Sequence, residues 1–459
     1  MVNYSYMPTD KNVLDLLDAN LIGRNQDISQ FLKLLSNMED DCYSIALNGD
    51  WGAGKTFFIK QMKLLLDARN PCSAMEDGLR SDVLRVAGSS FAIPDSYTTV
   101  YYDAWLNDNQ TDPILSLIYA SFVSGQSKFS QENIRSLSGI AAALVSMLTG
   151  LDTVSFWDSL QGENPFEAQE SEDAIHSYVE RFIDGLIQER GNRLVFFIDE
   201  LDRCKPDYAV RFLERIKHYF DDDRVTFVFA VNLSQLQWTV KSYYGSQFDA
   251  TRYLDKFFDL RIPLRSLDYE AYLLNRLKID HSRVFNAVAI ESAKYFRFTL
   301  REIERYGRML KIVDSAIRNS PENISGDNAI SFSASYIVPI VLAVQMHDIG
   351  RYNSFIGGLE PDLMTQILLR PNIEMDINLL MVPGEIYNPQ TRYIQEHRVS
   401  LEAVSLSDRL KKVYEALFTQ PLGNGSDGQT ITVGKMTFSS FTRQCIEEIT
   451  SMLSPGSDY

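Results

Sequence analysis

Short apolar runs alternate with amphipathic segments over roughly the first 265 residues of the chain. Five short runs are predicted to be strands: 42–48, 98–102, 194–198, 225–231 and 259–264. The runs 42–48 and 194–198 are apolar enough to indicate buried strands. Between the five runs, apolar residues recur at helical spacing and predict helices over 57–68, 114–123, 174–189, 207–220 and 233–243. This alternation indicates an α/β fold with a mostly parallel sheet covered on both faces.

The flanks of this pattern are less regular. Two helices are expected before the first strand, one over 12–19 and one after the turn at Gly23, where Ile28, Phe31 and Leu35 follow helical spacing. Residues 69–96 show no clear helical or strand periodicity and are predicted to be irregular. Residues 124–175 are the least regular part of the chain.

The pattern changes near residue 268, where strands give way to helices. Helices are predicted over 268–279, 286–296, 299–318, 335–347 and 441–452, with 360–420 mainly helical. The segment TITVGKMTF follows the loop signal NGSDG and suggests a small hairpin. We therefore predict a core over 1–265, a helical lid over 266–330 and a mainly helical C-terminal domain over 331–459.

Composition places the chain among globular proteins, at 45% hydrophobic and 23% charged residues. The net charge of −17 opposes broad contact with nucleic acid or anionic lipid, although a local basic groove stays an open alternative. The four cysteines are scattered and have the pattern of reduced thiols, and the first residues show no secretory signal. We expect a cytoplasmic protein.

Two apolar segments are candidates for a membrane span. Leu137–Leu151 and Ala334–Met346 both fall short of the roughly 18 residues that a spanning helix needs, and Pro339 interrupts the second. We interpret both as buried helices and expect no membrane span.

One loop between a strand and a helix carries the strongest chemical signal. Its sequence GDWGAGKT fits G-x-x-x-x-G-K-[ST], the phosphate-binding P-loop. Glycines let the backbone approach the phosphates, the loop amides form an anion nest, and the lysine and threonine reach the phosphates and magnesium. The predicted nucleotide-binding residues are Gly49, Asp50, Trp51, Gly52, Ala53, Gly54, Lys55 and Thr56.

A second signal is the acidic end of the strand LVFFI. Asp199 there is predicted to hold magnesium together with Thr56, and Glu200 to activate the attacking water. The distance in sequence from Lys55 is long for one nucleotide-binding core, so we predict a large insertion at about 124–175.

These motifs together resemble the KAP family of P-loop NTPases. The matching runs are GDWGAGKT, VYYDAWLNDNQTDP, FFIDELDRC, RYLDKFFDLRIPL and FTLREIERYGRML, which span roughly residues 10–315. Many members carry two membrane helices between the P-loop and the acidic strand. This chain has only the run Leu137–Leu151 at that place, and Asp103 stands where the family usually has asparagine.

The resemblance also implies roles for residues outside the two motifs. Asn232 follows the fourth strand and suits a sensor of the attacking water or γ-phosphate, or a simple helix cap. Arg301 lies in a segment similar to the family's arginine-bearing lid helix. Gly23 and Arg24 resemble the turn that lines the adenine pocket in related ATPases, and Arg252 is a candidate arginine finger.

The resulting hypothesis is a magnesium-dependent ATPase that acts as a switch or assembly engine, with ATP and Mg²⁺ bound at the P-loop. The resemblance implies a homo-oligomer in bacterial defence against phage or plasmids, with an effector protein acting in trans. A nucleic-acid motor or loader and a small-molecule kinase are the alternatives. The pair His347–Asp348 lacks the additional ligands of a phosphohydrolase metal site, and we interpret it as structural.

Overall fold

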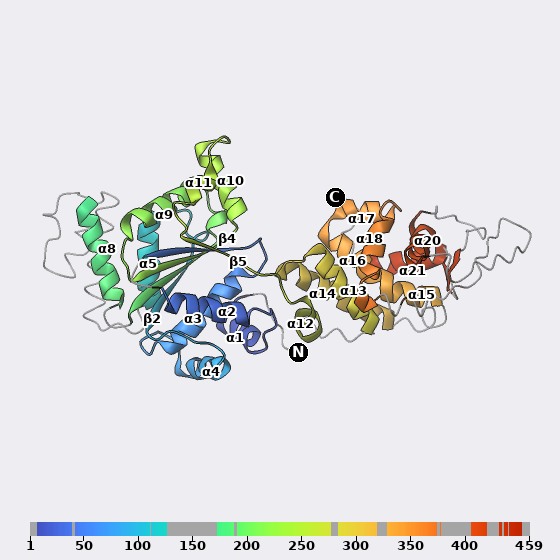
Figure 1. The fold of residues 1–459 in the computed structure, drawn as a ribbon, viewed down its shortest axis with the longest axis horizontal. Coiled ribbons are helices and arrows are strands. Elements are labelled where there is room, and N and C mark those ends of the chain that lie inside the picture. Colours follow the sequence, from blue (N-terminus) through green and yellow to red (C-terminus); the bar gives the residue numbers. More distant parts are fainter. Residues whose placement is uncertain are drawn as a thin grey trace, which may run out of the picture. The chain divides into compact units, whose positions relative to one another are not determined.

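The computed structural model describes residues 7–38, 42–110, 112–125, 172–187, 191–276, 283–318, 328–373, 377, 405–419, 431–433, 436–438 and 440–451. The chain divides into two compact units, Met1–Arg265 and Ser266–Tyr459, which are drawn in Figure 1. The predicted helix at Leu137–Leu151 and most of the predicted insertion lie outside the described residues.

A five-stranded sheet forms the centre of the first unit, within its described residues. Its strands are β1 (Tyr43–Asn48), β2 (Tyr97–Asp103), β3 (Arg193–Asp199), β4 (Val225–Val231) and β5 (Leu260–Pro263). They run in the order β2-β3-β4-β1-β5, and every neighbouring pair is parallel. The predicted parallel sheet is therefore confirmed, and the carboxyl ends of its strands meet at one edge.

Helices cover both faces of this sheet (Figure 1). The helix α3 (Lys55–Arg69) packs on β2, β3 and β4, beside α1 (Asp10–Asp18), α2 (Asn25–Ser36) and α4 (Asp77–Ala87). The other face is covered by α5 (Pro113–Gly125), α8 (Glu172–Ile187), α9 (Pro206–Tyr219), α10 (Leu233–Tyr244) and α11 (Ala250–Leu254). Because β3 and β4 are buried along their whole length, their sequences are continuous apolar runs and not alternating ones.

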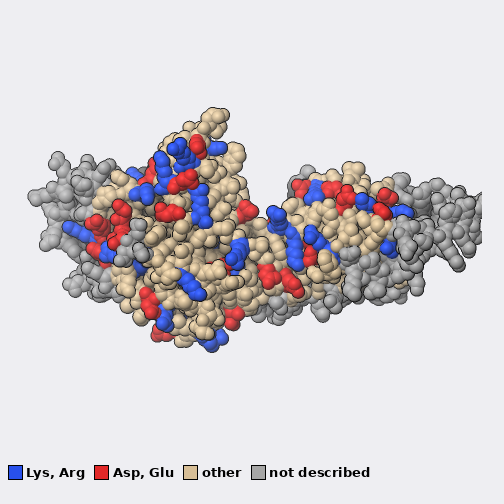
Figure 2. Space-filling view, in the orientation of Figure 1, with Lys and Arg blue, Asp and Glu red and all other residues tan. Residues whose placement is uncertain are grey.

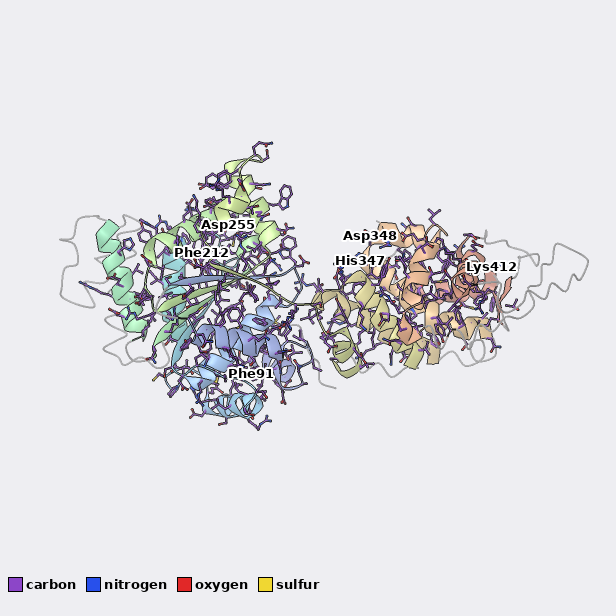
Figure 3. The ribbon with its side chains drawn as sticks, viewed as in Figure 1. Phe91, Phe212, Asp255, His347, Asp348 and Lys412 are labelled. Atoms are coloured by element: carbon purple, nitrogen blue, oxygen red, sulfur yellow. The ribbon has the colours of Figure 1, made fainter. Side chains whose placement is uncertain are left out.

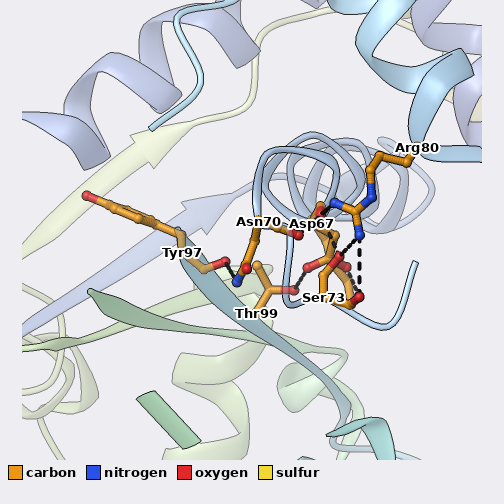
Figure 4. A network of polar contacts seen from close by, with 7 residues as sticks. Asp67, Asn70, Ser73, Arg80, Tyr97 and Thr99 are labelled. Carbon is orange, nitrogen blue, oxygen red and sulfur yellow. Dashed lines mark hydrogen bonds and ion pairs between the residues drawn. The ribbon is translucent and has the colours of Figure 1, made fainter. Parts of the chain in front are cut away.

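The helix α4 corrects the prediction that 69–96 is irregular. Only Val83 and Ala87 of this helix are buried, so its apolar pattern is too sparse to signal a helix. Arg80 holds it in place by donating to the carbonyl oxygens of Asp67, Ala68 and Asn70 at 2.6–3.0 Å. Figure 4 shows this network, in which one guanidinium satisfies carbonyls at the end of α3 that have no partner inside that helix.

A tight approach between two segments of the first unit gives a test of this packing. A Cβ built on Gly191, just before β3, would lie 1.8 Å from the carbonyl oxygen of Ser96, just before β2. We expect Gly191→Ala to destabilise the protein by about 1–3 kcal/mol, measured by chemical unfolding, because backbone must move to admit the methyl group. Gly78→Ala is the matched control, since nothing lies within 4 Å of its added Cβ. Equal stability of the two variants would contradict the close approach.

The second unit is mainly helical in its described residues. It contains, in chain order, α12 (Tyr269–Ala271), the π-helical turn η3 (Tyr272–Arg276), α13 (Arg283–Phe296), α14 (Leu300–Arg318), α15 (Asn328–Phe332), the π-helical turn η4 (Ser333–Ile337), α16 (Val338–His347), α17 (Ile349–Ile356), α18 (Pro361–Leu368), α20 (Leu406–Phe418), the antiparallel hairpin of β6 (Ile431–Val433) and β7 (Met436–Phe438), and α21 (Ser440–Ser451). The division of this unit at residue 330 remains a prediction.

One helical stretch of this unit differs from the prediction for Ala334–Met346. A continuous helix runs from Asn328 to His347, and its 20 residues are long and apolar enough to cross a membrane by length and composition. Pro339 does not break it, because the proline lies at the start of α16, directly after the π-helical turn. Of its most apolar window 83% is buried inside the protein, as in a core helix.

Candidate nucleotide-binding site

The predicted P-loop lies between β1 and α3, at the carboxyl edge of the sheet. Gly52 and Gly54 have φ angles of 78° and 90°, in the left-handed region where glycine is favoured. The loop is anchored at its start, where the Gly49 N–H donates to the carbonyl of Val231 at 3.1 Å. The first-turn amides of α3 have no partners within the helix, and together with the helix dipole they form an anion-binding end.

Lys55 is folded back onto its own loop. Its ammonium group donates to the carbonyl oxygens of Gly49 at 2.7 Å and Asp50 at 3.2 Å, and the residue is only 8% exposed. Burial lowers the pKa of Lys55, and the carboxylates of Asp202, Glu200 and Asp199 oppose that shift. The ammonium therefore lies close to three carboxylates.

Asp199 ends β3 and is 1% exposed. Its carboxylate accepts from the Tyr101 hydroxyl at 3.1 Å and from the Glu200 N–H at 3.1 Å, and it is hydrogen-bonded to the Thr56 side chain. Burial raises the pKa of Asp199 to about 6, and the hydrogen bonds from Thr56 and Tyr101 oppose the shift. A buried carboxylate beside a threonine hydroxyl supplies the hard oxygen ligands that Mg²⁺ prefers, so these two residues fit the predicted metal.

The raised pKa gives a prediction for the protein without metal. A carboxyl whose folded-state pKa lies above its unfolded value contributes stability that is complete below about pH 4 and is lost as pH rises through about 6. In EDTA at pH 8, we therefore expect Asp199→Asn to raise the free energy of unfolding by about 1–2 kcal/mol. Denaturant titrations at pH 8 and pH 5 test this, and the gain should shrink at pH 5. A variant less stable than the wild type at pH 8 would contradict it.

Glu200 follows in a left-handed backbone conformation, with φ of 60°. That conformation is uncommon for residues other than glycine, and such residues are enriched at functional sites. The pKa of the Glu200 carboxyl is raised to about 7, first by burial and then by the neighbouring Asp199, while Arg203, which forms an ion pair with it, opposes the rise. A carboxyl with a pKa near neutrality is suited to accept a proton from water.

Asn232, at the end of β4, is placed beside the P-loop and caps α10. Its side-chain oxygen accepts from the N–H groups of Ser234 at 3.1 Å and Gln235 at 3.2 Å, so the predicted helix cap is present. Its amide nitrogen donates to the carboxylate of Asp50 at 3.3 Å. The side-chain oxygen of Asn232 is thus used by the helix cap, while its amide nitrogen faces the P-loop. The sensor role remains a prediction.

Gly23 and Arg24 also lie against the P-loop. Gly23 has a φ of 73°, and Arg24 is only 3% exposed. The guanidinium of Arg24 donates to the carbonyl oxygens of Ala53 at 2.8 Å and Arg265 at 2.7 Å. The arginine thus connects the loop to the chain after β5, and its predicted place in an adenine pocket remains untested.

Three other sequence candidates belong to other elements of the chain. Arg301 is exposed in the first turn of α14 in the second unit, and Arg252 is exposed on α11. Figure 3 labels His347 and Asp348 at the end of α16. His347 packs on Phe296 with ring centroids 4.8 Å apart, and Asp348 caps α17, so this pair is structural as predicted.

The structure adds contacts that the sequence did not predict. Tyr101 reaches Asp199 because β2 lies beside β3, in register from Tyr97 with Arg193 to Asp103 with Asp199. The indole N–H of Trp51 donates to the carboxylate of Asp202 at 2.6 Å and so joins the P-loop to the segment after β3. The run VYYD contains the tyrosine, but its partner depends on strand order, which local patterns do not encode.

Comparison with known proteins now adds to this geometry. The family described as KAP family P-loop domain matches residues 24–316, more than half of the chain. This chain belongs to the KAP family. It therefore contains a P-loop NTPase domain, and nucleotide binding follows from that membership.

Two further comparisons add little. No curated protein sequence matches the chain. The solved structure of the ORC2 protein of Aeropyrum pernix, in ADPNP–ADP complexes, aligns over 86% of this chain and 94% of that chain, with 12% sequence identity and a TM-score of 0.33. We draw no inference from a likeness of that strength.

Proposed function

We propose that this KAP-family protein hydrolyses ATP with magnesium and uses the reaction as a conformational switch. The observation that carries the proposal is the meeting of four side chains at one edge of the sheet. Lys55 and Thr56 from the P-loop lie close to Asp199 and Glu200 from the end of β3. This set contains a phosphate-binding cation, two oxygen donors for a metal and a basic carboxylate.

Each side chain has a separate part in the proposed reaction. Lys55 leaves its carbonyl partners and donates to the β- and γ-phosphates, while the loop amides bind the same phosphates. Thr56 and Asp199 would hold Mg²⁺, which neutralises phosphate charge when bound. Glu200 accepts a proton from the attacking water, and Asn232 orients that water or the γ-phosphate.

The same site fits hydrolysis and phosphoryl transfer, and the product separates them. We expect free phosphate to be released from ATP by the protein alone, in amounts equal to the ADP formed. A phosphorylated small molecule formed in place of free phosphate would instead support the kinase alternative.

The charge distribution favours the switch over a nucleic-acid motor. Among the described residues on the face shown in Figure 2, Lys and Arg side chains are interspersed with Asp and Glu and do not form a continuous basic band. The net charge of −17 points the same way. Binding of DNA or RNA that weakens steeply with salt would support the motor instead.

The biological setting of the switch is inferred from the family. KAP-family membership supports a role in bacterial defence against phage or plasmids, with ATP-dependent self-assembly and an effector protein acting in trans. The mass of the assembly, measured by light scattering with and without ATP and magnesium, tests the assembly step. We expect a larger species with ATP, and an unchanged mass would contradict self-assembly as the output of the switch.

A further inference from the structure

Arg203 lies next to the proposed catalytic carboxylate because of the local backbone geometry. Residues Leu201–Arg203 form the 3₁₀ turn η2 directly after Glu200. In such a turn, side chains three positions apart lie on the same side. Arg203 accordingly turns back over Glu200 and forms an ion pair with it, and the two side chains are only 24% and 22% exposed.

Two tryptophans flank the guanidinium of Arg203. Its central carbon lies 5.8 Å from the ring centroid of Trp51 and 5.6 Å from that of Trp105, within the range of cation–π attraction. The two residues are 46% and 52% exposed, although large aromatic residues are usually mostly covered. Their exposure is explained if their function is to hold the arginine and not to fill a core.

The two segments that carry the tryptophans are each held by a hydrogen bond to the chain around the end of β3. Trp51 belongs to the P-loop, and its indole N–H donates to Asp202 at 2.6 Å. Trp105 follows β2, where the N–H of the preceding residue, Ala104, donates to the carbonyl of Asp199 at 2.9 Å. Arg203 is thus held between the phosphate-binding loop and the strand beside β3.

The carboxylate of Glu200 needs such support. Its backbone is in the left-handed region, which puts the side chain at a sharp turn. The negative side chains near it are Asp199 and Asp202, which repel it, and the positive ones are Arg203 and Lys55. Since Lys55 is expected to be occupied by phosphate during the reaction, Arg203 is left as the nearby cation that can orient the carboxylate.

We propose that Arg203 is a positioning residue for ATP hydrolysis, which it supports by holding the Glu200 carboxylate while Trp51 and Trp105 hold the guanidinium. This inference rests on the proposed function, in which Glu200 activates water. Arginine suits this role better than lysine, because a planar guanidinium can lie near two aromatic rings while its N–H groups pair with a carboxylate. Arg203 contacts neither substrate nor metal in this account.

A double-mutant cycle with single-turnover phosphate release tests the proposal. Arg203→Gln should lower the maximal single-turnover rate constant by about 10-fold and change the half-saturating concentration by less than about threefold, because only the reacting state loses an interaction. In the Glu200→Gln background the same substitution should change the rate by less than about twofold, since its target is gone. Arg203→Lys should recover only part of the loss.

The controls separate positioning from folding and from the proposed function itself. Arg211→Gln makes the same charge change on α9, where Arg211 pairs with Asp207 at an exposed site, and should leave the rate unchanged. Circular dichroism of each variant checks the fold. An equal fractional loss in both Glu200 backgrounds, no loss, or a gain in rate would each overturn the positioning role. A wild-type protein that releases no phosphate would instead overturn the proposed function.

Discussion

Lys55→Ala is expected to weaken ATP binding by at least about 100-fold, which corresponds to about 2.7 kcal/mol. The ammonium is a buried cation of the P-loop itself and in this structure donates to two loop carbonyls, close to where phosphate oxygens would bind. Charged hydrogen bonds of that kind contribute about 1.5–3 kcal/mol each. Calorimetric titration with magnesium and a non-hydrolysable ATP analogue measures the change.

The matched control for this prediction lies two turns further along the same helix. Lys63→Ala removes an equal charge from α3, but Lys63 pairs with Asp67 and does not contact the P-loop. We expect it to bind the analogue like the wild type. If Lys55→Ala binds within about threefold of Lys63→Ala, the phosphate-binding role of Lys55 is wrong.

Glu200→Gln is expected to separate binding from hydrolysis. The amide keeps the size of the carboxylate, so affinity for magnesium and ATP should stay within about threefold of the wild type. It cannot accept the proton from water, and loss of a general base costs about 10²–10⁴ in rate. Single-turnover release of phosphate gives the rate, and the calorimetric titration above gives the affinity.

A surface carboxylate provides the comparison for Glu200. Glu180→Gln changes the same group at an exposed position on α8, and its rate should equal that of the wild type. A Glu200→Gln protein that hydrolyses ATP as fast as Glu180→Gln would show that another group activates the water. The position of Arg203 would then need a different explanation.

The sequence predicted those parts of the site that neighbouring residues determine. The P-loop is a local strand–loop–helix unit, and the apolar run before Asp199 is long enough to mark a buried strand, so both were predicted and both are present. Their proximity also followed, because parallel strands place their carboxyl ends at one edge.

Other contacts depend on residues far apart in the chain. Tyr101 reaches Asp199 only because β2 lies beside β3. Arg24 donates to the carbonyl of Arg265, which lies 241 positions later in the sequence, at the last residue of the first unit. The helix α4 was missed because it buries only two residues. The helix around Pro339 was predicted over 335–347, but its start at Asn328 was missed, because a π-helical turn joins the preceding helical segment to α16. These features arise from packing and not from periodicity.

The most direct test of the account is the release of phosphate from ATP by the purified protein, measured in parallel for the wild type and for Lys55→Ala. We expect steady release from the wild type with magnesium, little release in EDTA, and none above background from Lys55→Ala. Equal release by the two proteins, or none by the wild type with magnesium, would contradict the central claim that the P-loop and the acidic end of β3 form a hydrolytic site.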